Sequence, residues 1–344
     1  MIKYKREKLI RKLSKKKYIG LGRIPIGIGA VIKGWNIEEK NYRNPSRLPV
    51  VDFRAMTEAC PHNCYHCFTD KNRKTLTLNE IKMVIDQLAE VNTYTIDFVG
   101  EGEPTIDKDF FKIIEYTSSK GINSVIYTDA AIKMRDRNFV KRVYESGASV
   151  CPKCDSLFNE EYQNWVVGDK TGKYFKQRNK AIELLMKYGF NDIQEDGTTR
   201  LGFDMVITKR NIDEVERTLR YCRENNLWII FVSYLPSGRS GKEDFDKSLM
   251  VDEKDFAKMR ERVRKIDEEY GFFHPIYNTL TTMRCIEFMQ IYGDGRVSPC
   301  VGNEDIIGNV REFSIKKLEN KILEKYQFFN RVKFDGNCPY RSKI

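Results

Sequence analysis

Short apolar runs and longer amphipathic stretches alternate along most of this 344-residue chain. The apolar runs are rich in Val, Ile and Phe, as buried strands are, and several amphipathic stretches end at a glycine, as helices commonly do. Strands are predicted over residues 50–56, 94–99, 122–128, 148–152, 200–207 and 227–233. Helices are predicted over residues 78–91, 108–120, 136–146, 173–188, 211–225 and 252–270. This alternation predicts an α/β fold whose parallel strands are joined by right-handed crossovers, with fewer strands than a closed eight-stranded barrel.

Three closely spaced cysteines, Cys60, Cys64 and Cys67, follow the first predicted strand. Thiolates are the ligands of iron–sulfur clusters and of zinc, and a loop that supplies three of them leaves one iron of a four-iron cluster open for chemistry. His62 and His66 lie in the same loop, so a mixed Cys/His zinc site is an alternative. Structural zinc usually joins two paired knuckles, and no second pair lies nearby in the sequence. An iron–sulfur cluster is therefore the leading interpretation.

This loop resembles the cluster-binding loop of the radical S-adenosylmethionine (radical SAM) superfamily. The likeness extends to residues 100–104, which read Gly-Glu-Gly-Glu-Pro after the second predicted strand. The resemblance implies a partial (β/α)6 barrel and a 4Fe-4S cluster on the three loop thiols, with the amino and carboxylate groups of SAM chelating the open iron. It also implies that Gly102, Glu103 and Pro104 bind the cofactor beneath the methionine part of SAM.

Other positions are assigned to SAM by the same resemblance. His66 stands where the family usually has an aromatic residue and is predicted to contact the cofactor, while Glu101 replaces the first of two paired glycines. Asp129, after the third predicted strand, is expected to accept a hydrogen bond from a ribose hydroxyl. Lys153 and Asp155, after the fourth, are expected to contact the SAM carboxylate and ribose.

Cys151 and Cys154 form a CxxC pair at the predicted mouth of the barrel. Strand alternation sends Cys151 and Lys153 to one side and Cys154 to the other, if the strand stays extended. One interpretation is a buried structural cysteine beside an incidental thiol. The other makes Cys154 a hydrogen-atom donor, since S–H bonds are weak enough to quench a carbon radical, and that role would mean epimerisation.

After the last of these helices the alternation stops. Residues 286–292 and 296–300 read as two short strands joined through Asp-Gly, which predicts a hairpin. The hairpin brings Cys285 and Cys300 to one end, and their spacing resembles the opening of SPASM and Twitch auxiliary-cluster domains. Together with Cys338 they would hold a second Fe-S cluster that lacks a fourth thiol, with structural zinc as the alternative. The predicted domains are a basic N-terminal segment over residues 1–48, a radical SAM partial barrel over residues 49–272 and a SPASM/Twitch-like domain over residues 273–344.

Charge and composition add limits on location and partners. The net charge of the chain is +11, and residues 1–17 alone carry nine Lys or Arg against one Glu. This segment is either a solvated basic helix or a surface for an acidic partner or membrane. No apolar run approaches the ~20 residues of a membrane span. Nine cysteines without a secretory signal are typical of metal ligands in a reducing compartment, so a cytoplasmic location is predicted.

The resemblance implies an enzyme that reductively cleaves SAM to a 5′-deoxyadenosyl radical and abstracts hydrogen from a small polar metabolite or a peptide side chain. A flavodoxin or ferredoxin-type protein would donate the electron, and the second cluster would assist oxidation or rearrangement. One alternative is a redox-neutral epimerase, decarboxylase or lyase that uses Cys154. Another is an Fe-S or zinc nucleic-acid-binding protein with a basic N-terminus, whose binding would depend steeply on salt.

Overall fold

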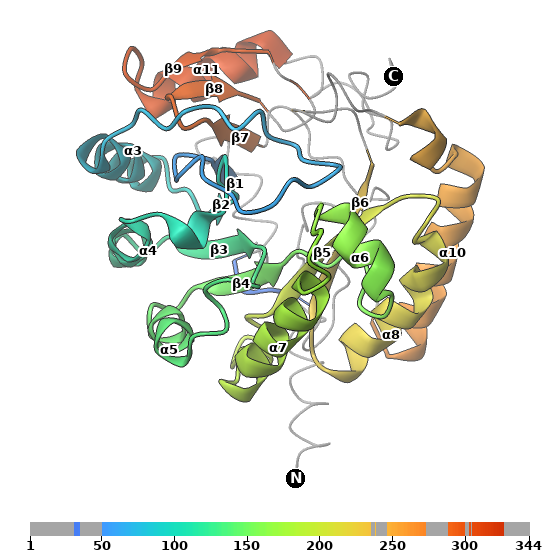
Figure 1. Ribbon diagram of the computed structural model, residues 1–344. Coiled ribbons are helices and arrows are strands. Elements are labelled where there is room, and N and C mark those ends of the chain that lie inside the picture. The colour runs from blue at the N-terminus through green and yellow to red at the C-terminus, as the bar shows by residue number, and fades with distance from the viewer. Residues whose placement is uncertain are drawn as a thin grey trace.

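The chain folds into a curved sheet of mainly parallel strands with helices on its outer side (Figure 1). The computed structural model describes residues 31–34, 50–234, 238, 246–272, 288–299, 303 and 305–326. The strands are β1 (Val50–Phe53), β2 (Thr95–Phe98), β3 (Asn123–Thr128), β4 (Ser149–Pro152), β5 (Gly202–Ile207), β6 (Trp228–Ser233), β7 (Phe288–Ile291), β8 (Arg296–Ser298) and β9 (Gly308–Asn309). The α-helices are α3 (Leu78–Glu90), α4 (Phe110–Ser119), α5 (Arg137–Glu145), α6 (Glu160–Val166), α7 (Tyr174–Lys187), α8 (Val215–Glu224), α10 (Glu253–Glu269) and α11 (Ile315–Tyr326).

The strand order is that of an open parallel barrel. β1, β2, β3 and β4 pair in parallel in sequence order, and β5 pairs in parallel with β6. Isolated parallel bridges between Val150 and Leu201 and between Lys153 and Asp204 connect β4 to β5. The two groups of strands therefore continue one another, and the predicted α/β fold with a partial (β/α)6 barrel is confirmed.

The C-terminal hairpin belongs to the same sheet. β7 and β8 pair antiparallel on either side of Asp294 and Gly295, which confirms the predicted hairpin. β7 also pairs in parallel with β1, with Val50 opposite Phe288, a contact that the sequence pattern did not predict. The division at residue 273 remains a prediction, because the described part of the C-terminal segment extends the barrel sheet.

Arg311 fastens the C-terminal segment to α3. Thr77 caps α3 and exchanges hydrogen bonds with Glu80 in a capping box. The Arg311 Nε lies 2.6 Å from a Glu80 carboxylate oxygen, and the same guanidinium donates to the Thr75 carbonyl oxygen at 2.8 Å. The start of the first barrel helix is thus held by a residue from the other end of the sequence.

Helix α6 lies in the connection between β4 and α7, where no helix was predicted. The Asn159 side chain caps it by accepting a hydrogen bond from the Tyr162 backbone N–H. The helix is short, and Gln163 and Asn164 are buried on it although they are polar. An apolar repeat therefore does not mark this helix in the sequence.

The two faces of the strands differ in polarity. Phe53 and Phe98 pack edge to face on neighbouring strands, with ring centroids 5.9 Å apart. Asp52, by contrast, lies opposite Asp97 and Gln290 on the strands to either side, and none of the three is more than 6% exposed. A buried polar row thus runs along one face of the sheet. Within the described residues, no helix combines the length and apolarity that crossing a membrane requires.

Candidate active site

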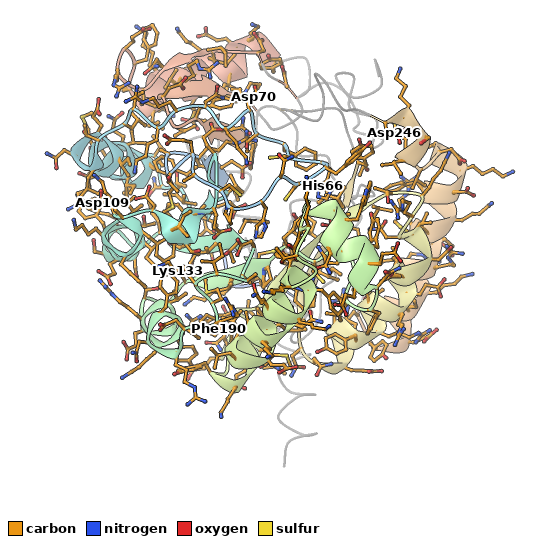
Figure 2. All side chains as sticks on the ribbon, viewed as in Figure 1. His66, Asp70, Asp109, Lys133, Phe190 and Asp246 are labelled. Carbon is orange, nitrogen blue, oxygen red and sulfur yellow. The ribbon has the colours of Figure 1, made fainter. Side chains whose placement is uncertain are left out.

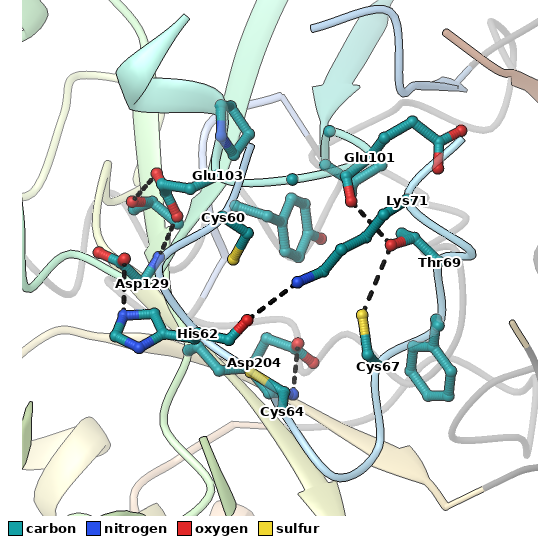
Figure 3. Close-up of a pocket in the computed structure, with 18 of the residues that line it drawn as sticks. Cys60, His62, Cys64, Cys67, Thr69, Lys71, Glu101, Glu103, Asp129 and Asp204 are labelled. Atoms are coloured by element: carbon teal, nitrogen blue, oxygen red, sulfur yellow. Dashed lines mark hydrogen bonds and ion pairs between the residues drawn. The ribbon is translucent and has the colours of Figure 1, made fainter. Parts of the chain in front are cut away.

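A cavity of about 220 Å³ lies where β1–β5 end and where the cysteine loop covers them (Figure 3). In parallel α/β folds the carboxyl ends of the strands are the usual place for reacting groups, because loops there can vary without disturbing the sheet. Every strand from β1 to β5 contributes a polar or reactive side chain to its wall. These strand-end groups are Asp52, Glu103, Asp129, Cys151, Lys153 and Asp204.

The cysteine loop is held in place by the end of α6. The Tyr65 backbone N–H donates to the Val166 carbonyl oxygen at 2.8 Å, and the Asn63 N–H donates to the Val167 carbonyl oxygen at 3.1 Å. Gly168 has a φ of +70°, and a Cβ there would lie 2.8 Å from the Asn63 carbonyl oxygen. The unpredicted helix therefore fixes the backbone of the loop that carries the three thiols.

The three loop thiols all line this one cavity, as predicted for ligands of one cluster. Burial raises the pKa of Cys60 to about 11 and also raises the pKa of Cys64, whose charge would be opposed by the other two thiolates. Lys71 counteracts this shift at Cys60, and Lys153 does so at Cys64. Thiols in such surroundings keep their protons until a metal displaces them.

Lys71 spans the loop. Its Nζ donates to the His62 carbonyl oxygen at 2.9 Å (Figure 3). Its backbone has a φ of +52°, which is uncommon for a residue with a side chain. The chain therefore places a cation beside the predicted thiolate ligands, where it favours negative charge.

The donor set fits a cluster better than a single ion. A mononuclear zinc site needs ligands that converge on one point, and in the part of the chain that the structure describes no three His, Cys, Asp or Glu side chains are grouped in that way. Three thiols around one cavity with lysines beside it suit the larger, thiolate-ligated 4Fe-4S cluster. The predicted ligands of a second cluster, Cys285, Cys300 and Cys338, lie outside the described residues.

Gly102 lets the predicted SAM segment pass directly beneath the cysteine loop. A Cβ at this position would lie 2.1 Å from the Ala59 carbonyl oxygen. The Gly102 backbone N–H donates to the Thr57 carbonyl oxygen, and the Glu103 N–H donates to that of Ala59, each at 2.9 Å. Only glycine fits this approach, so the glycine serves the packing of the loop whatever it does for a cofactor.

Glu103 connects the ends of β2 and β3. Its carboxylate accepts hydrogen bonds from the Thr105 backbone N–H and hydroxyl, from the Thr128 hydroxyl and from the Asp129 backbone N–H. Burial, and next the charge of Asp129, raise the pKa of Glu103 to about 8. The oxygens are already used within the chain, and with this pKa the group is mostly protonated at neutral pH until a cation bound beside it favours the ionised form. Pro104 follows it in the cavity wall.

The carboxylate of Asp129 contacts the imidazole of His62 in the cysteine loop. The Asp129 carboxylate lies 2.9 Å from His62 Nε2, and its other oxygen accepts from the Ile132 backbone N–H. The Tyr174 ring packs edge to face on His62 and its hydroxyl donates to the Asp129 carbonyl oxygen. The predicted ribose acceptor thus lines the cavity but shares its carboxylate with the cysteine loop.

Lys153 lies between the buried carboxylate of Asp155 and the partly buried carboxylate of Asp204. Its Nζ is 3.0 Å from Asp204 and 3.3 Å from Asp155. Burial works against the charged amine, but the attraction of the two carboxylates outweighs it and raises the pKa of Lys153. Lys153 lines the cavity, whereas Asp155 does not and instead accepts a hydrogen bond from the Val206 backbone N–H. The structure therefore brings Lys153 to the site and leaves Asp155 as its support.

His66 is buried in the wall of the cavity, near the middle of the molecule (Figure 2). Its Nε2 lies 3.5 Å from the Asp155 carboxylate. Burial lowers the pKa of His66 to about 4, so the imidazole is neutral at physiological pH. A neutral ring at this position offers a planar, weakly polar surface much as the family's aromatic residue does.

Cys151 and Cys154 lie on opposite sides of the sheet, as strand alternation predicts. Both thiols are fully buried and pack in the apolar core, but only Cys151 also lines the cavity. The charges that act most strongly on Cys154 are those of Arg178 and Asp155. The predicted hydrogen-donor role of Cys154 is therefore not supported by its position, because the thiol that faces the cavity is Cys151.

Several cavity residues were not assigned a role from the sequence. Asp52, Tyr127 and Asp204 each lie within an apolar strand and line the cavity, and a lone polar residue inside such a strand is the signal that could have marked them. Arg54 and Glu101 also line it, and each is at most 4% exposed. Glu101 accepts a hydrogen bond from the Asn72 backbone N–H, so the residue that replaces a family glycine braces the cysteine loop.

Comparison with known proteins agrees with this geometry. Residues 55–222 match the family model of the radical SAM superfamily. The PqqA peptide cyclase of Bradyrhizobium diazoefficiens is 32% identical over 320 residues, covering 86% of this chain and 80% of that protein. The mycofactocin maturase MftC of Mycolicibacterium smegmatis is 22% identical over 187 residues, covering 54% of this chain and 44% of the relative.

Solved structures share the fold. Native anSMEcpe with bound AdoMet and Cp18Cys peptide has a TM-score of 0.63 at 18% identity, with 83% of this chain and 86% of that chain covered. Streptococcus suis SuiB bound to precursor peptide SuiA has a TM-score of 0.58 at 14% identity, with coverages of 79% and 64%. The chain belongs to the radical SAM superfamily. It is a radical SAM enzyme whose cofactors are a 4Fe-4S cluster and SAM.

Proposed function

We propose that this enzyme removes a hydrogen atom from a carbon atom of a peptide side chain in the cavity at the ends of β1–β5. The observation that carries the proposal is the meeting of the three loop thiols with the polar strand-end groups around one cavity. When bound there, the cluster and SAM supply the 5′-deoxyadenosyl radical chemistry of the superfamily. A peptide is favoured over a small polar metabolite because the 32%-identical relative is a peptide cyclase.

Each side chain has a proposed task. Cys60, Cys64 and Cys67 hold the cluster, and Lys153 pairs with the carboxylate of SAM. The ammonium group of SAM, once bound, favours the ionised form of Glu103, and Asp129 accepts a hydrogen bond from the ribose of SAM. The backbone at Gly102 and Pro104 and the neutral ring of His66 complete the binding surface.

A second cluster and an electron donor belong to the same proposal. Cys285, Cys300 and Cys338 would ligate a second Fe-S cluster, which would bind the substrate or accept an electron from it. A flavodoxin or ferredoxin-type protein would reduce the first cluster, and the basic segment over residues 1–17 would meet an acidic partner. The SPASM/Twitch-like likeness of residues 273–344 supports the second cluster.

Anaerobic reconstitution and iron counting test the proposal. About four irons per chain imply one cluster and about eight imply two. With dithionite and SAM, short peptides encoded beside the gene should raise 5′-deoxyadenosine formation above the peptide-free background, and sugars or nucleosides should not. The variant with Cys60, Cys64 and Cys67 all replaced by Ala should lack the cluster and leave SAM intact. Turnover by that variant would overturn the proposal, as would an intact protein that holds zinc on the loop and does not cleave SAM.

A further inference from the structure

One reactive group in the cavity has no task in this scheme, the thiol of Cys151. In the parallel ladder Cys151 lies directly opposite Tyr127 of β3, and both side chains line the cavity. Asp204 of β5 lines it as well, on the other side of β4. The thiol therefore lies in the wall of the same cavity that the three loop cysteines line.

The surroundings of Cys151 keep it a neutral thiol. Burial raises its pKa well above the ordinary value of 9.0, and the charges of Asp204 and Asp97 raise it further. Lys153 acts in the opposite direction but is outweighed. A thiolate would be a nucleophile or a metal ligand, whereas a neutral thiol carries an S–H hydrogen that a carbon radical can remove.

The cavity also has independent marks of a polar ligand. Arg54 and Glu101 line it and are 4% and 1% exposed. Within the part of the chain that the structure describes, Arg54 Nε and Glu101 Oε1 are both buried without a hydrogen-bond partner. Buried polar atoms are almost always paired in proteins, so these two point to a polar group of a bound molecule in the cavity that Cys151 faces.

We propose that Cys151 is a catalytic residue that returns a hydrogen atom to the carbon radical of the substrate. The inference rests on the proposed function, which generates that radical. The S–H bond breaks and a C–H bond forms, so the substrate carbon regains one hydrogen and the sulfur becomes a radical. One electron from the one-electron reductant that feeds the cluster, and one proton from water, restore the thiol. The substrate keeps its oxidation state, so the product is an epimer or a rearranged isomer.

The core thiols provide controls for this assignment. Cys154 lies on the same strand end but faces the core, and Cys222 is buried in α8. A serine at any of the three positions keeps nearly the same shape but has a stronger O–H bond. The Cys151→Ser variant therefore removes the weak S–H hydrogen with little change in packing, and Cys222→Ser is its matched control.

The first measurement tests access without turnover. Infrared spectra of reconstituted full-length protein record the S–H stretching bands of its thiols, and the difference between wild type and Cys151→Ser isolates the band of Cys151. SAM added without reductant should shift this band, because Cys151 borders the cavity, and should leave the bands of Cys154 and Cys222 in place. A missing S–H band of Cys151, or one that SAM leaves unchanged, would overturn the assignment.

The second measurement uses SAM and dithionite in D2O without substrate. The 5′-deoxyadenosine formed should carry one deuterium from solvent, taken from the exchanged thiol of Cys151. The deuterium should be lost in Cys151→Ser and retained in Cys154→Ser and Cys222→Ser. Unchanged deuterium in Cys151→Ser would overturn the Cys151 assignment and leave the proposed function standing. Absence of 5′-deoxyadenosine from every protein, both without substrate and with the peptides of the proposed function, would overturn both.

Discussion

The two sides of β4 carry the same kinds of side chain in opposite surroundings. On the cavity side are Cys151 and Lys153, and on the core side are Cys154 and, from α7, Arg178. Arg178 is fully buried, and its guanidinium donates hydrogen bonds to the side chains of Asn179 and Gln163 and to the carbonyl oxygens of Lys153 and Ser156. Lys153 keeps part of its surface at the cavity although two carboxylates hold it. A buried side chain whose hydrogen-bond donors are all used within the chain stabilises the fold. A side chain that still faces a cavity can also bind a ligand there.

Removing the cavity cation should have the largest effect. Lys153→Met leaves the carboxylates of Asp155 and Asp204 buried without their cation, and breaking a buried ion pair in this way costs about 3–5 kcal/mol of the free energy of unfolding. The difference in free energy of unfolding between wild type and Lys153→Met should become smaller as pH falls. Burial already raises the pKa of Asp204, and without the lysine the folded state takes up a proton on this carboxylate at a pH where the unfolded state has lost it.

Urea unfolding of Lys153→Met between pH 5 and pH 8 measures this effect. SAM affinity, measured by equilibrium dialysis on folded reconstituted protein, should fall as well, because Lys153 is proposed to pair with its carboxylate. Lys153→Arg, which keeps the charge, should recover part of both losses. If Lys153→Met binds SAM as tightly as the wild type does, Lys153 stabilises the fold and does not pair with the SAM carboxylate.

Removing the core cation should cost stability alone. Arg178→Met leaves the Ser156 and Lys153 carbonyl oxygens without this donor, and about 3 kcal/mol is expected from two unsatisfied buried acceptors. Arg264→Met is the control, since Arg264 pairs with Glu261 and Glu268 at the surface, where solvent screening leaves such pairs a small contribution to stability. Urea unfolding compares the two variants. If the two variants lose the same small amount of the free energy of unfolding, the expectation that a core cation stabilises the fold more than a surface cation is wrong.

Sequence patterns were sufficient for the barrel, because each strand and helix is a local run with its own periodicity. The loop thiols were recognisable for the same reason, as their spacing is local. The pairing of β7 with β1 joins the two ends of the described chain, and no local pattern carries it. Helix α6 was not predicted because one of its buried residues, Gln163, is polar, so the helix shows no apolar repeat. The Gln163 side-chain oxygen accepts a hydrogen bond from the Ser156 backbone N–H.

Side-chain partners were harder to predict than positions. Alternation separated Cys151 from Cys154 correctly, but which of them meets the cavity depends on the register of β4 with β3, which places Cys151 beside Tyr127. The partner of Lys153 is Asp204 on the neighbouring strand, far away in sequence. Pairs of this kind arise only when the sheet is assembled, so the sequence indicated the reactive residues but not their neighbours.

The pH dependence of stability sharpens the description of Glu103. The ordinary pKa of a glutamate is 4.5, and in the folded protein that of Glu103 is about 8, because of burial and then Asp129. Between these values the folded state holds a proton that the unfolded state has released, so the free energy of unfolding should decrease as pH rises from 5 to 8. A contribution of about 3 kcal/mol is expected over this range.

The comparison with Glu103→Gln isolates that contribution. The difference in free energy of unfolding between wild type and Glu103→Gln, measured in urea on protein without cofactors, should fall steadily over this pH range. Thr105→Val, which removes a hydroxyl donor to the same carboxylate, should preserve the slope while lowering stability at every pH. A pH-independent difference would mean that Glu103 is ionised throughout.

The smallest effect is expected at the core thiol. Cys154→Ala removes one sulfur atom from a fully buried site, and about 1 kcal/mol of the free energy of unfolding should be lost through the small cavity that remains. Cys151→Ala should lose a similar amount or less, because its sulfur borders an existing cavity. Urea unfolding and the deuterium content of 5′-deoxyadenosine are measured on the same preparations. The two variants should be alike in stability and differ in isotope content, and loss of deuterium in Cys154→Ala with retention in Cys151→Ala would reverse the assignment of the two sides of β4.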